Sequence, residues 1–438
     1  MADGSAPRFD SDTEAQGLID YVDASPTPFH ACEQAAARLE AEGFVRLDER
    51  EPFPTAPGAH LLLRGGSLIA WDTRGTHAAG AGPAAGFRVV GAHTDSPNLR
   101  LKPHADHVKA GWQMLAVEPY GGLILNSWLD RDLGLAGRVA VRTADGVTTR
   151  LFHDRDPLLR VAQLAIHLDR TQNDELSLNR QQHMVPLWGL GEAPGDVTAY
   201  LAEQVGAERE DVLSYDVMTH PVQPSARIGL ERELVAAPRL DNLATSYAGT
   251  RALLRTAASE PAHVPVLVLF DHEEIGSTSE RGATSTLLPS VLERIVTAGG
   301  GTREDYWRAL AATVIASGDM AHATHPNYAD RHEPMHRIAM NGGPVLKVNT
   351  NLRYATDAVG AAAFRLACEQ AGVPVQTFVT RSDLPCGSTV GPVTSSLTGA
   401  TTVDFGAPML SMHSARELCG AHDVPMYVAA LAAFLDPR

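Results

Sequence analysis

The chain has 438 residues, of which 44% are hydrophobic and 20% are charged, and its formal net charge is −16 at pH 7. This acidic balance argues against nucleic acid as a partner, because phosphate backbones are themselves anionic. The apolar runs are too short to cross a bilayer, so no membrane association is expected. The polar start, MADGSAPRFDSDTEAQG, lacks a secretory signal pattern, and the four scattered cysteines suit reduced thiols. We therefore expect a cytoplasmic protein of two or three domains.

The first part of the chain, residues 1–95, begins with helical patterns in TEAQGLIDYVDAS and FHACEQAAARLEAEG. The segment 25–28, which contains two prolines, predicts the break between these helices. A hairpin follows in HLLLRGGSLIAWDT, with its turn at Gly65 and Gly66, and a buried strand follows in GFRVVGAHTD. This part therefore combines helices and strands.

The middle part, residues 96–236, has a different character. Antiparallel strands are predicted in WQMLAVEPYGGLILNSWL and in RVAVRTADGVTTRLF, the second with a turn at Asp145 and Gly146. Short helical patterns occur in LLRVAQLAIHL and VTAYLAEQV. We interpret this part as a mainly β insertion.

The last part, residues 237–438, alternates helices with strands. Helices are predicted in LATSYAGTRALLRTA, EDYWRALAAT, AVGAAAFRLACEQAG and VPMYVAALAAFL, and strands in VPVLVLF, VIAS, PVLKVN and VPVQTFV. This alternation predicts an α/β domain with a helix-covered mixed, largely parallel sheet, in which sites lie beyond the carboxyl ends of the strands.

Acidic and histidine residues stand at the ends of several predicted strands and at two helix starts. They are His93 and Asp95 after GFRVVG, Glu273 and Glu274 after VPVLVLF, Asp319 after TVIAS, and Asp241 and His413 at the helix starts. Any single such residue is more often a cap or a solvated loop group than a functional one. As a set, however, they offer the imidazole and carboxylate ligands that zinc accepts, so the sequence predicts a centre of two divalent metal ions.

Within this centre, we expect Asp241 to bridge the two metal ions. His93 and Asp319 would complete one site, and Glu274 and His413 would complete the other. Catalytic zinc sites keep one coordination position open for water or substrate, so the predicted chemistry is hydrolytic.

Two further carboxylates have no ligand role in this scheme. Glu273 is adjacent to the ligand Glu274, and we expect it to act as the general base that passes a proton from water to the leaving amine. Asp95 lies two residues beyond His93, on the same side of an extended chain, where it can hold the imidazole in its ligating tautomer.

Over nearly its whole length the sequence resembles the aspartyl aminopeptidases, a family of cytoplasmic aminopeptidases with two metal ions. The matching stretches are VVGAHTDSPNLRLKP, QLAIHLDR, RLDNLATSYAG, DHEEIGSTSERGA, SGDMAHATHPNYADRHEP, GGPVLKVNTNLRYATD, CGSTVGP and PMLSMHSARE. The resemblance implies the same five ligands and the same base. It also implies that residues 96–236 form a β-rich dimerisation domain inserted into the catalytic domain, and that dimers assemble into a tetrahedral dodecamer.

Two histidines acquire roles only through this resemblance. His167 lies in QLAIHL, where the apolar neighbours favour a core or interface histidine, whereas the family would place it in a neighbouring subunit's active site. There it would either stabilise the tetrahedral intermediate or ligate zinc, and the sequence leaves both alternatives open. His322, in GDMAHA, is a candidate for substrate contact.

Lys347, in PVLKVN, is one of only three lysines in the chain. An ion-paired or snorkelling side chain is the ordinary interpretation of a lysine in a strand. By resemblance, Lys347 would instead pair with the acidic side chain of the substrate's first residue.

The sequence thus predicts a zinc aminopeptidase that removes N-terminal Asp or Glu from peptides by attack of a dizinc-bound hydroxide. The alternatives within the enzyme class are an aminopeptidase that prefers neutral residues such as Leu and a two-zinc deacylase. The alternative from another class is an inactive peptidase fold that serves as an assembly or cargo protein.

Overall fold

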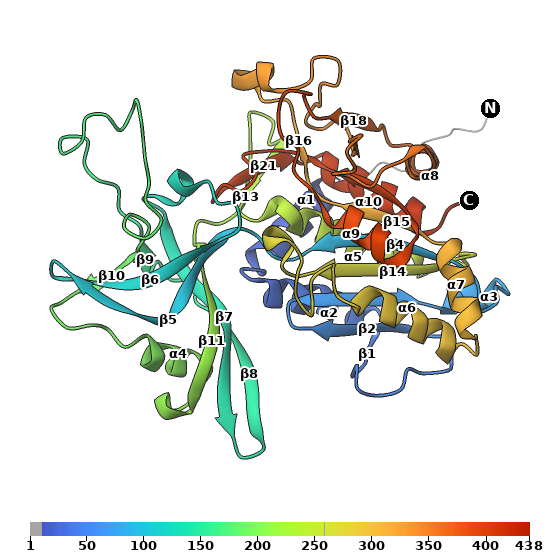
Figure 1. Cartoon of the computed structure of the whole chain (residues 1–438), viewed down its shortest axis with the longest axis horizontal. Coiled ribbons are helices and arrows are strands. Elements are labelled where there is room, and N and C mark those ends of the chain that lie inside the picture. Colours follow the sequence, from blue (N-terminus) through green and yellow to red (C-terminus); the bar gives the residue numbers. More distant parts are fainter. Residues whose placement is uncertain (1–10, 258) are drawn as a thin grey trace. The chain divides into compact units, whose positions relative to one another are not determined.

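The structure is a computed structural model that describes residues 11–257 and 259–438 (Figure 1). The chain divides into two compact units. The first comprises the described residues through Asp95, Ser225–Met412 and Glu417–Arg438, and the second comprises Ser96–Pro224 and His413–Arg416. The first ten residues, which carry part of the argument against export, lie outside the described residues. No helix in the described ranges combines the length and the apolar character that a membrane crossing needs.

The first unit contains a nine-stranded mixed sheet in the order β1-β2-β3-β14-β4-β15-β19-β17-β18. At its centre β14, β4, β15 and β19 run parallel, as the helix and strand alternation predicts. The strands are β1 (Val45–Arg46), β2 (Ala59–Arg64), β3 (Ser67–Asp72), β4 (Phe87–His93), β14 (Val264–Phe270), β15 (Val314–Gly318), β17 (Val345–Val348), β18 (Gln376–Val379) and β19 (Thr401–Gly406).

Both faces of this sheet are covered by helices, so the predicted fold class is confirmed. The helices are α1 (Ser11–Asp23), α2 (Pro28–Ala41), α3 (Arg74–Ala78), α5 (Leu240–Thr256), α6 (Leu287–Ala298), α7 (Arg303–Ala311), α8 (Ala358–Ala371), α9 (Val390–Thr398) and α10 (Asp423–Leu435). A five-stranded sheet adds β12 (Ala226–Ile228), β13 (Leu234–Ala237), β16 (Ala321–His322), β20 (Pro408–Leu410) and β21 (Glu417–Gly420).

The strand β14 has the sequence VPVLVLF, which is apolar at every position because both faces of the strand are buried. Leu267 and Leu269 pack into one core cluster, whereas Val266, Val268 and Phe270 pack into the cluster on the opposite face. Because successive side chains of a strand point to opposite faces, a strand covered on both sides has no solvent-facing position. Because every position within the strand is buried, polar residues can follow only after its end.

The second unit is built on a seven-stranded antiparallel sheet in the order β11-β5-β6-β10-β9-β7-β8. Its elements are β5 (Asn98–Lys109), β6 (Trp112–Tyr120), β7 (Asp132–Thr143), β8 (Gly146–His153), β9 (Leu159–Arg160), β10 (Leu187–Leu190), β11 (Val212–Pro221), α4 (Val197–Val205), and the 3-10 helices η1 (Leu125–Trp128) and η2 (Arg209–Asp211). Thr143 pairs with Gly146, so the predicted hairpin turn is confirmed.

The helix predicted in LLRVAQLAIHL is wrong. This segment supplies the short strand β9 and then continues as irregular chain. The side chains of Leu164, Ile166 and Leu168 are 54%, 42% and 75% exposed. The apolar spacing imitates a helix, but an amphipathic helix depends on packing its apolar face, and these apolar side chains are exposed.

Similarly, the stretch WQMLAVEPYGGLILNSWL forms only one strand, β6, and the 3-10 helix η1. The strand ends at Tyr120, directly before Gly121, whose φ of 72° interrupts extended backbone.

Candidate metal centre

His93, Asp241 and Asp319 come together at the carboxyl edge of the central sheet. His93 is the last residue of β4, and Asp319 follows β15, which is parallel and adjacent to β4. The Nε2 atom of His93 lies 3.4 Å from an Asp241 carboxylate oxygen and 3.6 Å from an Asp319 carboxylate oxygen. His93 is 1% and Asp241 is 3% exposed, so this cluster of ligand atoms is buried.

Asp241 is held at the start of α5 by two interactions of the surrounding backbone. Its amide donates a hydrogen bond of 3.0 Å to the Glu417 carboxylate. The side-chain amide of the next residue, Asn242, donates to the carbonyl of Gly318 at 2.8 Å. Asp241 is thereby fixed beside the end of β15, which is followed by Asp319.

Glu417 and Asn242 are site residues that sequence reasoning missed. Glu417 is 2% exposed, and buried carboxylates need partners. Its partner is a backbone amide 176 positions away, so no local pattern signals the contact. Glu417 lies in the motif PMLSMHSARE and Asn242 in the motif RLDNLATSYAG. Their presence in these motifs is the one sequence signal that could have identified them.

Glu273 and Glu274 follow β14 and form the 3-10 turn η3 (Glu273–Ile275). The Asp95 carboxylate accepts hydrogen bonds from the amides of both glutamates, each at 3.1 Å. Each glutamate offers an oxygen within 4.8 Å of His93, and Glu274 offers one within the same distance of Asp241. The structure therefore brings together the paired glutamates and the other ligand candidates of the first unit.

The segment 271–283, DHEEIGSTSERGA, is tied together by its own residues. Arg281 donates a hydrogen bond of 2.8 Å to Asp271, which is 1% exposed. The ring of His272 lies 2.8 Å from the Ser279 hydroxyl. His272 and Gly276 adopt left-handed backbone conformations on either side of η3, and this sharp turn orients the two glutamates.

Asp95 also contacts the His93 ring, and the closer contact is with the Asp95 backbone. The Nδ1 atom of His93 lies 2.9 Å from the Asp95 carbonyl oxygen and 3.5 Å from its carboxylate. A proton on Nδ1 directed at Asp95 leaves Nε2 to face the carboxylates of Asp241 and Asp319. This is the arrangement that metal-ligating histidines adopt.

The electrostatics of the cluster favour a bound cation. Burial raises the pKa of Glu273 well above its ordinary value, and the nearby carboxylates of Asp319 and Glu274 raise it further while His93 opposes them. Burial alone would lower the pKa of His93, but the carboxylates of Asp241 and Asp319 raise it well above its ordinary range. Buried carboxylates around one imidazole match the ligand types and charge that zinc requires, so the residues fit this metal.

Lys347 and His322 lie next to this cluster. Lys347 is 3% exposed, and its Nζ is 3.4 Å from Asp319 and 5.4 Å from the Tyr354 ring centre. His322 packs edge-on against Phe378. His322 is exposed at the surface, but the protein atoms packed around its ring and the positive charge of Lys347 lower its pKa to about 4.

The two remaining site candidates belong to the second unit. His413 follows β20 with a φ of 69°, and its Nδ1 lies 3.1 Å from the Gly122 carbonyl oxygen. His167 lies in the irregular segment after β9 and is exposed. The core interpretation of His167 is therefore wrong, because the described residues do not cover its side chain.

A helix-covered mixed sheet, with an imidazole and carboxylates clustered at the carboxyl edge of its parallel strands, is the arrangement expected of a metal-dependent hydrolase. The family model described as Aminopeptidase I zinc metalloprotease (M18) matches residues 21–435. The chain belongs to the M18 family of zinc aminopeptidases, and the predicted resemblance is confirmed.

Individual relatives agree with this assignment. A probable M18 family aminopeptidase 2 of Mycobacterium bovis is 54% identical over 96% of this chain and 98% of its own length. The cryo-EM structure of the Ape4 and Nbr1 complex contains a chain with a TM-score of 0.92 and 36% identity, over 97% of this chain and 86% of that chain. A chain in a structure of the S. cerevisiae mApe1 dodecamer matches with a TM-score of 0.82 and 29% sequence identity, over 97% of this chain and 97% of that chain.

Proposed function

We propose that the protein is a cytoplasmic aminopeptidase that removes N-terminal Asp or Glu from peptides and uses two zinc ions per subunit. The observation that carries this proposal is the buried cluster of His93, Asp241 and Asp319, with the cationic Lys347 3.4 Å from Asp319. A buried cation at the edge of a metal centre favours a substrate side chain of negative charge.

In this proposal Asp241 would be shared by two metal ions, with His93 and Asp319 as the further ligands of one ion and Glu274 and His413 as the further ligands of the other. Zinc bound in this way supplies Lewis-acid chemistry, because it polarises a carbonyl group and lowers the pKa of water. The backbone contacts from Glu417 and Asn242 keep Asp241 in position for the bridging role.

Glu273 acts as the general base. Its carboxylate takes a proton from the attacking water and returns that proton to the amine that leaves when the peptide bond breaks. Asp95 supports this step by holding the Glu273 amide, and its carbonyl orients the ring of the ligand His93. The proposed proton carrier, Glu273, is therefore held in position by the hydrogen bond from its backbone amide to Asp95.

Lys347 and His322 recognise the substrate. The Lys347 ammonium pairs with the carboxylate of an N-terminal Asp or Glu, while the neutral His322 ring contributes a hydrogen-bonding nitrogen. Since Lys347 already faces Asp319, an incoming carboxylate shares this cation with the metal ligand. With a substrate that has no negative side chain, the Lys347 ammonium would be paired with Asp319 and not with the substrate.

We further propose that twelve subunits assemble as dimers into a tetrahedral shell, with the second unit as the dimerisation domain. The mApe1 structure is a dodecamer, which supports this expectation. The exposed segment around His167, with its uncovered Leu164 and Leu168, suits a contact with a neighbouring subunit. There His167 would act on the reacting carbonyl or as a metal ligand.

The decisive experiment compares the release of p-nitroaniline from Glu-, Asp- and Leu-p-nitroanilide before and after metal removal. We expect the acidic substrates to react faster, a strong chelator to abolish activity, and added zinc to restore it. Faster reaction with Leu would favour the neutral aminopeptidase. Absence of any activity and of bound metal would favour the assembly or cargo protein.

A further inference from the structure

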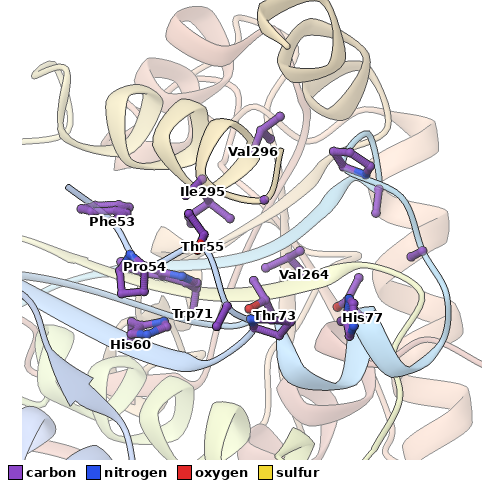
Figure 2. Close-up of a pocket in the computed structure, with 18 of the residues that line it drawn as sticks. Phe53, Pro54, Thr55, His60, Trp71, Thr73, His77, Val264, Ile295 and Val296 are labelled. Atoms are coloured by element: carbon purple, nitrogen blue, oxygen red, sulfur yellow. The ribbon is translucent and has the colours of Figure 1, made fainter. Parts of the chain in front are cut away.

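A cavity lies in the first unit, away from the metal centre. Its volume is about 270 Å³. Figure 2 shows the cavity between the end of α6, which carries Ile295 and Val296, and the segment that carries His60, Trp71 and Thr73. Proposed catalysis makes no use of any of these residues.

The position of the cavity separates it from the catalytic cluster. Phe87, the first residue of β4, lines the cavity, whereas His93, the last residue of the same strand, belongs to the metal centre. At about 3.3 Å per residue, the two ends of this strand are roughly 20 Å apart. The cavity therefore lies at the amino edge of the parallel strands, and the metal centre at the carboxyl edge.

One wall of the cavity is held rigidly. The rings of Phe53 and Trp71 stack with centres 5.2 Å apart and planes at 24°. The Arg294 guanidinium lies 3.7 Å from the Phe53 ring centre and donates a hydrogen bond to the Glu49 carbonyl. An apolar wall that is fixed in advance does not lose rotamer freedom when a ligand binds.

His60 gives this wall a polar group. Its ring packs on Trp71 with centres 5.6 Å apart, and the residue is 8% exposed. Burial lowers the pKa of His60, so the imidazole is neutral at pH 7. Among the described residues, the buried Nδ1 of His60 has no hydrogen-bond partner. Less than 1 Å² of this atom is exposed, so a molecule in the cavity would reach the other ring nitrogen of His60, Nε2.

The cavity selects against charge. Its lining includes apolar, aromatic, threonine and histidine side chains, and none of the described residues that line it is Asp, Glu, Lys or Arg. A charged ligand would lose its hydration without gaining an ion pair. An uncharged aromatic ligand loses little hydration free energy on entering such a site.

We propose that this cavity is a binding site for a small, uncharged, bicyclic aromatic molecule that carries one hydrogen-bonding group. Cavities of about 150 Å³ accommodate benzene, so about 270 Å³ suits two fused rings. The polar group lies on the His60 side, and the rings lie against Trp71 and Val296. The site is independent of the proposed peptidase function.

Indole is the test probe, and calorimetric titration into the metal-loaded enzyme is the measurement. We expect one indole per subunit with a dissociation constant of about 1 mM or tighter, as small ligands with good contacts reach. Chelator-treated protein should bind indole equally, which separates this site from the metal centre. Indole-3-acetate, which adds a carboxylate, should bind about tenfold more weakly or not at all.

Two variants test the location. Gly82 is an exposed residue at the rim of the cavity, and an added Cβ there would meet no atom within 4 Å, so Gly82→Phe adds a ring at this rim and Gly82→Ser is its matched control. Gly82→Phe should weaken indole binding about tenfold while Gly82→Ser does not, and His60→Leu should weaken it several-fold. A crystal structure with indole beside Trp71 would support the proposal. Failure of indole to bind, equal binding by both Gly82 variants, or indole located only elsewhere would overturn it.

Discussion

The Asp95 carboxylate accepts a hydrogen bond of 3.1 Å from the backbone amide of Glu273. Through this contact a residue that follows one strand positions the proposed base that follows a neighbouring strand. The second carboxylate oxygen of Asp95 accepts a hydrogen bond from the backbone amide of Glu274. Asp95 is therefore a positioning residue for both glutamates.

Asp95→Asn should lower kcat about 10- to 100-fold, a typical cost for a group that supports metal ligands. The amide replaces one acceptor oxygen with a donor that faces a backbone N–H, so the turn at η3 shifts. KM for Glu-p-nitroanilide should change less than kcat. Steady-state kinetics check this expectation, and the exposed hairpin variant Asp145→Asn is the control. Equal kcat in both variants would contradict the positioning role.

Glu273→Gln should lower kcat about 10²- to 10⁴-fold and leave the metal content unchanged, because the base is not a ligand. Glu274→Gln should instead weaken metal retention about 10-fold or more. Metal analysis after dialysis, combined with single-turnover rates, separates the two effects. The same metal loss in both variants would show that the roles of the neighbouring glutamates are not divided.

Glu417→Ala should destabilise the folded protein by about 1 to 3 kcal/mol, because it leaves the buried amide of Asp241 without its acceptor. It should also weaken metal binding, since Asp241 loses a support. Glu417→Gln keeps an acceptor oxygen and should restore most of both properties. Denaturant unfolding and zinc titration measure the changes, and equal behaviour of the two variants would contradict the role of the hydrogen bond.

Lys347→Met should reduce kcat/KM for Glu-p-nitroanilide about 10- to 100-fold and leave that for Leu-p-nitroanilide much less affected, because a hydrogen bond to a charged group is worth roughly 1.5 to 3 kcal/mol. The control is Lys102→Met, whose Nζ contacts Gln181 in the second unit. A parallel loss for both substrates would indicate that Lys347 serves the metal centre alone, through Asp319.

The buried Asp423 should make stability depend on pH. Burial raises its pKa to about 7, while the amides of Gly343 and Asn341 oppose this shift. Between the ordinary value of 3.8 and about 7, the folded protein binds a proton that the unfolded chain has lost, so this group's contribution to stability falls as pH rises and levels off above about 7. Asp423→Asn should flatten this trend. Melting temperatures at pH 5, 6, 7 and 8 check it, and identical slopes in the two proteins would refute it.

Much of the first unit was predictable because its strands are buried on both faces. In VPVLVLF every position is apolar, so the change to Asp271 marks the end of the strand and the place where polar groups gather. The same reasoning located His93 and Asp319, and the structure places both beside Asp241. Strand ends are visible in sequence because burial leaves a sharp compositional boundary.

Other features depend on contacts between distant residues and leave no local pattern. Glu417 acts on an amide 176 positions away, and Asn242 acts on the carbonyl at the end of β15. The strand β19, TTVDFG, escapes prediction because the buried Asp404 interrupts its apolar run. Asp404 is accommodated there by hydrogen bonds from Thr389 and the amide of Ala355. Segment 158–168 is wrongly predicted as helical because spacing alone does not show whether an apolar face is covered.

The candidate ligands gathered around His93 are far apart along the chain, and this order has a consequence for biosynthesis. His93 leaves the ribosome before the entire insertion, while Asp241, Glu274 and Asp319 follow at intervals of tens of residues. A nascent chain therefore contains His93 but lacks the complete candidate cluster until most of the polypeptide has been translated. Prematurely terminated fragments that stop before Asp319 therefore lack part of the candidate metal centre.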